Sequence, residues 1–133
     1  MRVSPDTNVL LRAVVGDDEA QAALATAALD EAETVAVSLQ TLCEFAWVLA
    51  RSYGVARADI AAAIRRLAAT RNVVLYRPAV EQGLRMLEAG GDFADGVIAW
   101  DGAALGAETF VSFDRKAVSL LVSQGVSARL LSI

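Results

Sequence analysis

Short apolar segments alternate with longer helical stretches along the chain, and this alternation constrains the possible fold more than any other feature. Five segments have the length and composition of strands: residues 2–3, 35–37, 73–76, 109–113 and 128–131. Stretches typical of helices lie between them, at residues 7–15, 17–33, 39–53, 57–69, 78–90, 93–106 and 115–123. Strands that alternate with helices favour a parallel sheet covered on both faces. We therefore predict an α/β fold with a central parallel sheet of about five strands.

The length and composition of the chain indicate one domain. It has 133 residues, of which 56% are hydrophobic and 21% are charged, and it shows no internal repeat, linker or low-complexity tract. A chain of this length can bury one core of its own, so we predict a single domain over residues 1–133. No apolar run approaches the roughly 20 residues that span a bilayer, and the first residues lack the apolar region of a secretory signal. We expect a cytoplasmic protein without a membrane segment.

The chain contains no histidine, and Cys43 is its single cysteine. The absence of histidine removes histidine-based acid–base catalysis, the serine–histidine and cysteine–histidine nucleophile pairs, and histidine-ligated zinc. The single cysteine removes an internal disulfide and a cysteine-rich zinc site. Hydrolytic chemistry would then depend on carboxylates, whose oxygens suit hard cations such as Mg²⁺ and Mn²⁺.

The formal net charge of −4 is unevenly distributed along the chain. Residues 1–44 contain eight acids and two bases, whereas residues 45–80 contain six arginines and a single acid. Residues 81–133 contain seven acids and four bases. The middle of the chain is therefore basic, while the acids that are candidates for chemistry lie on either side of it.

Two acids follow predicted strands. Asp6 comes after the first strand, and Asp114 comes directly after the strand at residues 109–113. Polar groups at the carboxyl ends of parallel strands line the ligand crevice of an open α/β sheet. The alternative is that each aspartate only caps the helix that begins after it, and either residue taken alone fits that alternative.

Glu44 is the only charged residue in the apolar stretch from residue 42 to residue 50. A carboxylate that is buried among apolar side chains is costly unless it is paired, hydrogen-bonded or bound to a metal. The alternative is a glutamate that faces solvent or pairs with a nearby arginine such as Arg51. Glu44 is therefore a candidate ligand with a structural alternative beside it.

Asp92 and Asp95 are three residues apart at the start of the helix predicted over residues 93–106. This spacing places both side chains near one face of the helix. Helix capping accounts for Asp92. It leaves Asp95 unexplained, because the apolar stretch that follows Asp95 should face the core.

The candidate acids come from separated segments and are predicted to meet at one edge of the sheet: Asp6, Glu44, Asp95 and Asp114, with Asp92 as a further candidate. Carboxylates that gather in this way repel one another and raise each other's pKa values. A bound cation removes that cost, and two cations about 4 Å apart can clamp a phosphoryl group during an in-line displacement. The sequence thus predicts a site for a divalent metal.

Four stretches resemble the motifs of PIN-domain proteins, of the kind that serve as VapC toxins in bacterial toxin–antitoxin pairs. They are residues 6–11, Glu44 within its apolar helix, residues 91–99 and residues 112–115. The resemblance implies a three-layer α/β/α fold and the Mg²⁺- or Mn²⁺-dependent hydrolysis of RNA phosphodiester bonds. It assigns the catalytic, metal-binding carboxylates to Asp6, Glu44, Asp95 and Asp114.

The resemblance also implies supporting roles for polar residues beside these acids. It makes Asp92 a further ligand or a neighbour of the ligands. It places the small hydroxyl side chain that lies near the metal at Thr7 or Ser112. It also implies that Asn8 orients the first loop.

Three positions depart from the pattern of the family. Gly96 stands where these proteins often have alanine, and Trp100 stands where a small residue is usual. Lys116 occupies a position that often holds an acid. The first two concern the packing of the helix that carries Asp95, and the third concerns a fifth acid. None of the three removes one of the four carboxylates.

Basic side chains are candidates for contacts with the RNA backbone, which carries one negative charge per phosphate. Most of the candidates lie in the basic middle of the chain, and two follow Asp114. They are Arg51, Arg57, Arg65, Arg66 and Arg71, together with Arg115 and Lys116. The alternative for each is an ordinary solvated charge on a helix surface.

Three functions fit these features. The first is an endoribonuclease toxin that a cognate VapB-like antitoxin holds inactive. The second is an RNA- or DNA-processing nuclease without an antitoxin. The third is a non-catalytic module that captures an arginine-bearing peptide in its acidic cleft.

The apolar character of the chain also predicts a partner surface. The mean hydropathy of +0.45 is high for a small domain. Phe45, Trp47 and Tyr53 lie on one predicted helix, and aromatic residues are enriched at protein interfaces. We expect a homodimer or an antitoxin contact there; the alternative is that these side chains fill the core.

Overall fold

Seven helices and five strands make up the chain, in the order that the sequence predicts. The computed structural model describes residues 1–133 and divides them into two units, residues 1–76 and residues 77–133. Every pairing between strands is parallel, which confirms the predicted α/β class. The strands form one sheet of three and one sheet of two, rather than one sheet of five. None of the helices combines the length and the apolar character needed to cross a lipid bilayer.

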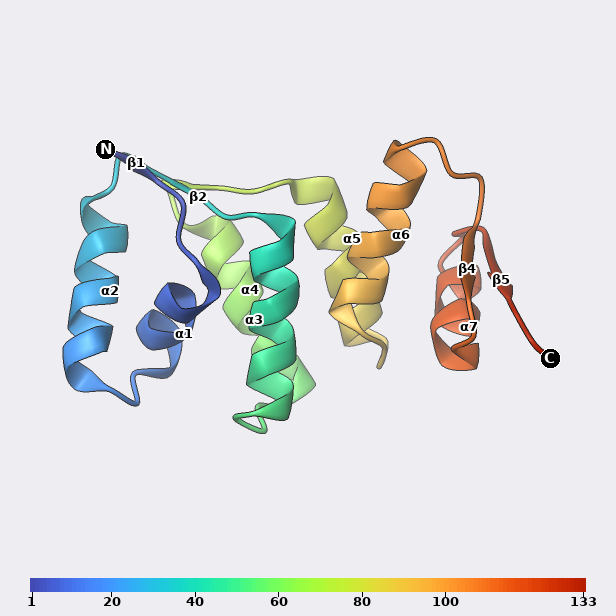
Figure 1. The fold of residues 1–133 in the computed structure, drawn as a ribbon, viewed down its shortest axis with the longest axis horizontal. Coiled ribbons are helices and arrows are strands. Elements are labelled where there is room, and N and C mark those ends of the chain that lie inside the picture. The colour runs from blue at the N-terminus through green and yellow to red at the C-terminus, as the bar shows by residue number, and fades with distance from the viewer. The chain divides into compact units, whose positions relative to one another are not determined.

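The first unit contains the three-stranded sheet, in the order β1-β2-β3 (Figure 1). Its strands are β1 at Arg2–Val3, β2 at Thr34–Ala36 and β3 at Val73–Val74. Val35 in the central strand pairs with Val3 on one side and with Val73 on the other. Strand β3 is shorter than the predicted strand at residues 73–76, because its pairing with β2 ends at Val74.

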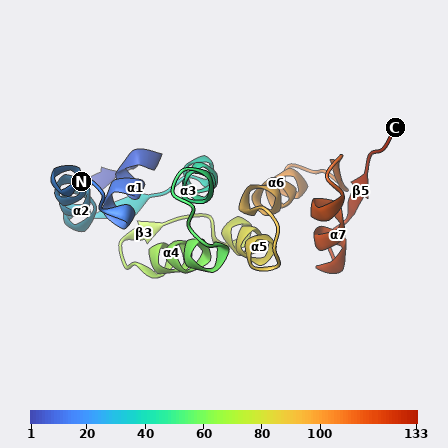
Figure 2. The same cartoon turned by 90° about the horizontal axis from the view of Figure 1, so that it is seen from below.

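Four helices complete the first unit. They are α1 at Thr7–Val15, α2 at Glu19–Glu31, α3 at Leu39–Arg51 and α4 at Arg57–Ala69. The first three are capped by the residues directly before them, Asp6, Asp18 and Ser38, whose side chains each accept a hydrogen bond from a backbone N–H in the first turn. Helix α1 packs against α2 and α3, and α3 packs against α4 (Figure 2). The largest buried side chains of this unit are Leu10, Leu42, Phe45, Leu49, Ile60 and Ile64.

The second unit combines three helices with the two-stranded sheet. Its elements are α5 at Arg77–Glu88, α6 at Phe93–Ala104, β4 at Phe110–Ser112, α7 at Arg115–Ser123 and β5 at Ala128–Leu130. Strands β4 and β5 pair from Phe110 opposite Ala128 to Ser112 opposite Leu130. Helix α7 packs against both strands. A buried cluster of Met86, Ala99, Ala117 and Leu121 forms part of the core.

Helices α5 and α6 lie side by side and approach each other through glycines (Figure 1, Figure 2). A Cβ at Gly96 would lie 2.6 Å from the carbonyl oxygen of Gln82 and 2.7 Å from the Cα of Gly83. The buried side chain of Gln82 donates a hydrogen bond from Nε2 to the carbonyl oxygen of Gly96, at 3.2 Å. The departure from alanine at position 96 therefore has a packing reason, since the helices are too close for a methyl group. Trp100, the second departure, is half-buried one turn further along α6.

Candidate metal centre

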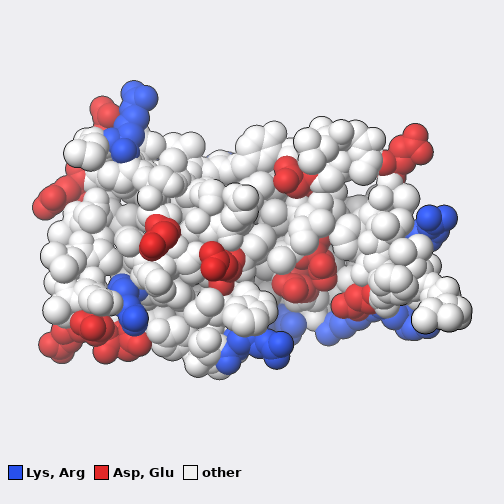
Figure 3. Space-filling model, in the orientation of Figure 1, with Lys and Arg blue, Asp and Glu red and all other residues white.

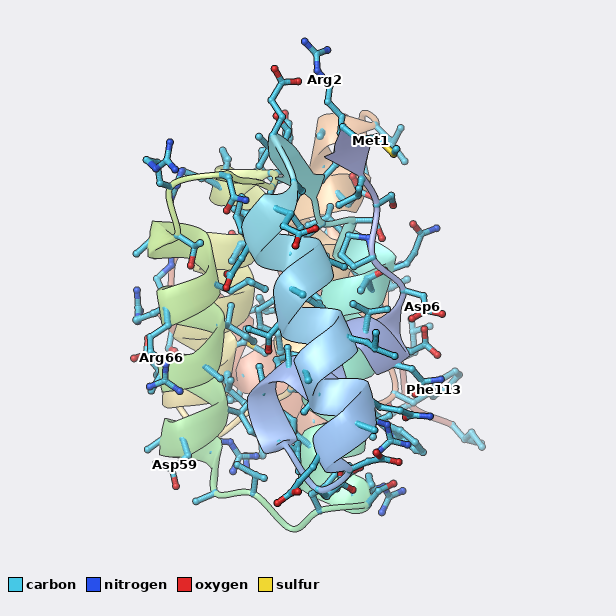
Figure 4. All side chains as sticks on the ribbon, turned by 90° about the vertical axis from the view of Figure 1, so that its left-hand side faces the viewer. Met1, Arg2, Asp6, Asp59, Arg66 and Phe113 are labelled. Carbon is cyan, nitrogen blue, oxygen red and sulfur yellow. The ribbon has the colours of Figure 1, made fainter.

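Glu44 contacts Thr7, the residue after Asp6, in the first unit, where helices follow the neighbouring parallel strands β1 and β2. Figure 4 labels Asp6 in front of α1. Asp6 caps α1, and its Oδ1 accepts a hydrogen bond from the N–H of Val9 at 3.0 Å. Its second oxygen accepts no hydrogen bond from the protein. Thr7 Oγ1 donates a hydrogen bond to Glu44 Oε1 at 2.9 Å, which joins the first turn of α1 to α3. Two acids from separate segments thus lie at one edge of the sheet.

Glu44 is exposed, so the argument from burial does not apply to it. The buried residues of α3 include Leu42, Phe45 and Leu49, which recur at the spacing of one helix face. Glu44 shares the opposite, exposed face with Trp47 and Arg51. The structure therefore shows the alternative that the sequence left open, in which the Glu44 side chain faces solvent. The case for Glu44 as a metal ligand therefore rests on its hydrogen bond with Thr7 and on the family motif.

Asn8 is exposed at the start of α1 and lines a groove of about 310 Å³ between α1 and α2. Asp6 lies at the same groove, as do Arg12 and Leu24. The Asn8 side chain makes no hydrogen bond with the protein, so the structure gives no support to a role in orienting the first loop. The cap formed by Asp6 fixes that loop instead.

Two of the three candidate acids in the second unit are helix caps. Asp92 caps α6, and its Oδ1 accepts a hydrogen bond from the N–H of Ala94 at 3.0 Å. Asp114 caps α7, and its Oδ1 accepts from the N–H groups of Lys116 at 3.0 Å and Ala117 at 3.1 Å. Asp95 lies in the first turn of α6, is half-buried and accepts no hydrogen bond. Capping therefore accounts for Asp92 and not for Asp95, as the spacing of the two acids predicts.

The charge of Asp95 is unfavourable in the folded chain. Burial raises the pKa of its carboxyl above the ordinary value, and the negative charges of Asp92 and Asp114 raise that pKa further. The three candidate acids of the second unit therefore interact through space, and their repulsion is of the kind expected for gathered carboxylates. A cation bound near Asp95 would remove this cost.

Ser112 and Lys116 surround Asp114 in the second unit. Ser112 Oγ accepts a hydrogen bond from the backbone N–H of Asp114 at 2.9 Å, so it positions the residue that carries the acid. Lys116 is exposed, and its Nζ lies 3.8 Å from the place that a Cβ at Gly90 would occupy. It therefore extends from the first turn of α7 toward the turn before α6. At this position the chain offers a cation in place of a fifth acid.

The candidate RNA-binding residues are all exposed. Five belong to the first unit, on α3, on α4 and in the loop after α4: Arg51, Arg57, Arg65, Arg66 and Arg71. Arg115 and Lys116 belong to the first turn of α7. Figure 3 shows basic side chains at a few separate places on one face, much of which is uncharged. Figure 4 shows Arg66 on the outer side of α4.

The three aromatic residues of the predicted partner surface lie in different environments. Phe45 is 1% exposed and belongs to the core, so its assignment to a partner surface is wrong. Tyr53 is 37% exposed, and its hydroxyl donates a hydrogen bond to Asp17 Oδ2 at 3.1 Å. Trp47 is 56% exposed, with the guanidinium carbon of Arg51 5.6 Å from the centre of its ring. Of the three, Trp47 is the residue that offers an open apolar surface.

The donor atoms of these sites fit a hard divalent cation. They are carboxylate oxygens with neighbouring hydroxyl groups, which suit Mg²⁺ and Mn²⁺. Neither unit by itself contains a group of three or more acidic or cysteine side chains arranged to hold a metal ion. The half-buried, unpaired carboxylate of Asp95 is the observation that most favours a cation, because nothing in the second unit balances its charge.

In open α/β sheets, ligands bind at the carboxyl ends of the strands, and the candidate acids follow strands or begin the helices of this α/β fold. The family model described as the PIN domain matches residues 3–120, and the chain belongs to the PIN domain family. PIN domains generally bind divalent metal ions and act as nucleases on nucleic acids. No curated protein and no solved structure matched the chain.

Proposed function

We propose that the chain is a Mg²⁺- or Mn²⁺-dependent endoribonuclease that acts as the toxin of a VapBC-type toxin–antitoxin pair. The observation that carries the proposal is Asp95, which is half-buried, unpaired and repelled by Asp92 and Asp114. A carboxylate kept in such a place at a cost to stability is typical of functional sites. Membership of a family of metal-dependent nucleases supports the hydrolysis of a nucleic acid.

In this proposal Asp6, Glu44, Asp95 and Asp114 hold the metal, and Asp92 is a further ligand or a neighbour. When bound, a divalent cation supplies the activation of water and the neutralisation of charge on the phosphate. The side chains of the protein fix the ligands. Thr7 holds the Glu44 carboxylate through its hydrogen bond of 2.9 Å, and the cap at α7 leaves Asp114 Oδ2 available.

We infer that both units form one PIN-like domain over residues 1–133, because the family match runs through both of them. The partners of this domain would be RNA, a VapB-like antitoxin and a second copy of the chain. The domain would act in the cytoplasm. The exposed arginines are the candidates for the RNA backbone. The exposed ring of Trp47 is the candidate for a homodimer contact, so Trp47→Ala should favour the monomer in sedimentation.

The central experiment measures RNA cleavage by the purified chain with Mg²⁺ or Mn²⁺. Asp6→Asn and Asp95→Asn should abolish cleavage, because each removes a charged ligand. Each variant has a matched control in the chain. Asp18→Asn alters an aspartate that caps α2 as Asp6 caps α1, and Asp101→Asn alters an exposed acid further along the helix of Asp95. Undiminished cleavage by Asp6→Asn and Asp95→Asn would refute the site.

Further measurements separate the toxin from its alternatives. Growth arrest on expression, relieved by a small DNA-binding protein encoded directly upstream, supports the toxin. An active nuclease that is harmless when overexpressed would instead be a processing enzyme without an antitoxin. A pure binding module need not bind Mg²⁺, so titration of the wild-type chain with Mg²⁺ by calorimetry tests the third function.

A further inference from the structure

Phe113 is the exposed aromatic residue of the second unit that lies next to a candidate metal ligand. It stands between β4 and α7, directly before Asp114, and is 74% exposed (Figure 4). Its neighbours are fixed on both sides. The carbonyl oxygen of Ser112 accepts a hydrogen bond from the N–H of Leu131 at 2.7 Å, and Asp114 is held by its own cap and by Ser112 Oγ. The ring is therefore presented to solvent by a fixed backbone.

The residues after Phe113 supply the charged groups that would accompany a nucleotide. Asp114 is a candidate metal ligand, and its charge acts on Asp95. Arg115 and Lys116 follow in the first turn of α7, and both are exposed. An aromatic face, a metal-binding acid and two cations thus occur within four consecutive residues. They correspond to the three parts of an RNA substrate that a nuclease contacts, namely the base, the scissile phosphate and the neighbouring phosphates.

We propose that Phe113 binds substrate by stacking on an unpaired base next to the phosphate that is cleaved, while Arg115 contacts the backbone. This inference rests on the proposed function and assigns to Phe113 the contact with an unpaired base beside the cleaved phosphate. Aromatic side chains stack on the bases of single strands, and every base offers a face for stacking. In a duplex the bases are already stacked on each other, and the ring would have no free face to contact.

The surroundings of Phe113 favour a nucleotide over a protein partner. The cores of protein interfaces are depleted of charged residues, and three charged residues follow Phe113 directly. One observation favours a protein partner instead. Val111, two residues before Phe113, is 46% exposed and lines a groove of about 290 Å³ together with Ile98. A protein contact is for this reason an explicit outcome of the test.

The test compares the cleavage of a short single-stranded RNA by four proteins with Mg²⁺ or Mn²⁺. They are the wild-type chain, Phe113→Ala, Phe113→Trp and the control Leu105→Ala. Leu105 is 85% exposed in the same unit, at the C-terminal end of α6, whereas Asp95 lies in the first turn of that helix. Loss of one stacked base should lower kcat/KM by about 5- to 100-fold in Phe113→Ala, mainly through KM. Phe113→Trp and Leu105→Ala should stay near the wild-type value.

A substrate with a single abasic position gives a second readout that a structural role of Phe113 would not alter. Moving the abasic position along the RNA should reveal one place at which wild-type cleavage falls and cleavage by Phe113→Ala does not. Equal kcat/KM for Phe113→Ala and the wild type overturns the inference and leaves the ribonuclease intact. A changed sedimentation of Phe113→Ala with unchanged kcat/KM shows a protein contact and overturns it as well. Absence of cleavage by the wild-type chain overturns the proposed function and the inference together.

Discussion

The two units hold their candidate acids in different ways. In the first unit Asp6 caps a helix, Glu44 accepts a hydrogen bond from a threonine hydroxyl, and both side chains are exposed. In the second unit Asp92 and Asp114 cap helices, but Asp95 is half-buried, accepts no hydrogen bond and has a pKa raised by burial and by the two other acids. The acids of the first unit are therefore compatible with a stable fold by themselves, whereas burial and two neighbouring acids make the charge of Asp95 in the second unit unfavourable.

The two units also differ in the size of the residues at which their own helices pack together. In the first unit α1 and α3 contact each other and bury large residues such as Leu10 and Phe45. In the second unit α5 and α6 approach through Gly83 and Gly96, with no room for a Cβ at either glycine. Because Asp95 precedes Gly96, the position of the unbalanced acid depends on this close approach.

The largest effect on stability is expected at the glycine contact. Gly96→Ala places a Cβ 2.6 Å from the carbonyl oxygen of Gln82, and backbone atoms cannot move aside without separating the helices. We expect the free energy of unfolding in urea to fall by about 1–3 kcal/mol, as for other additions of volume to a packed core. Gly102→Ala is the control on the same helix, because a Cβ there meets nothing within 4 Å.

The control should change stability in the opposite direction. Alanine replaces glycine in a helix with a gain of roughly 0.5–1 kcal/mol when space allows. A similar change of sign and size in both variants would contradict the close contact between α5 and α6. It would also remove the packing reason for glycine at position 96.

Features of the fold that have local signals were predictable from the sequence. The helices at residues 7–15, 57–69 and 115–123 have the predicted bounds. Apolar residues recur at helical spacing in each segment, and Asp6 and Asp114 cap the first and the last of the three. Strand ends are less well defined by such signals. Leu75 and Tyr76 continue the apolar run of β3, yet they lie beyond its pairing with β2.

The candidate site was predictable only in part. The spacing of Asp92 and Asp95 correctly separated the cap from the unexplained acid. The apolar neighbours of Glu44 suggested burial, although the helical spacing of Leu42, Phe45 and Leu49 already places Glu44 on the other face. The close contact between α5 and α6 joins residues that are distant in the sequence, and glycine has no side chain whose pattern could reveal it.

The second prediction concerns the charge of Asp95 in the absence of divalent cations. Its folded-state pKa lies above the ordinary value of 3.8, so ionisation costs more in the folded chain than in the unfolded chain. The contribution of Asp95 to stability is therefore most favourable below the unfolded pKa, and it is lost as the pH rises toward and through the folded pKa. Asp95→Asn removes this loss, and we expect it to raise the free energy of unfolding at neutral pH by roughly 0.5–1 kcal/mol, allowing for solvent screening.

Urea unfolding measures this effect at two pH values, one neutral and one below the pKa of Asp95 in the unfolded chain. The buffer contains a chelator of divalent cations. The difference between Asp95→Asn and the wild type should shrink at the lower pH, where the wild-type carboxyl is protonated. Asp101→Asn, an exposed acid on the same helix, should change little at either pH. A variant at position 95 that is less stable than the wild type at neutral pH would show that the charge of the second unit is already balanced.

The smallest effect is expected from removing the charge of Glu44 in the first unit, which should not stabilise the protein. Glu44→Gln keeps an oxygen that can accept the hydrogen bond from Thr7 Oγ1, so its free energy of unfolding should stay close to that of the wild type. Thr7→Val removes the donor and should lower stability by about 0.5–1 kcal/mol, the usual net contribution of one hydrogen bond. Combining Thr7→Val with Glu44→Ala should cost less than the sum of the two single changes, because both break one contact. A gain in stability from Glu44→Gln as large as that from Asp95→Asn would mean that the acids of the two units are equally unbalanced.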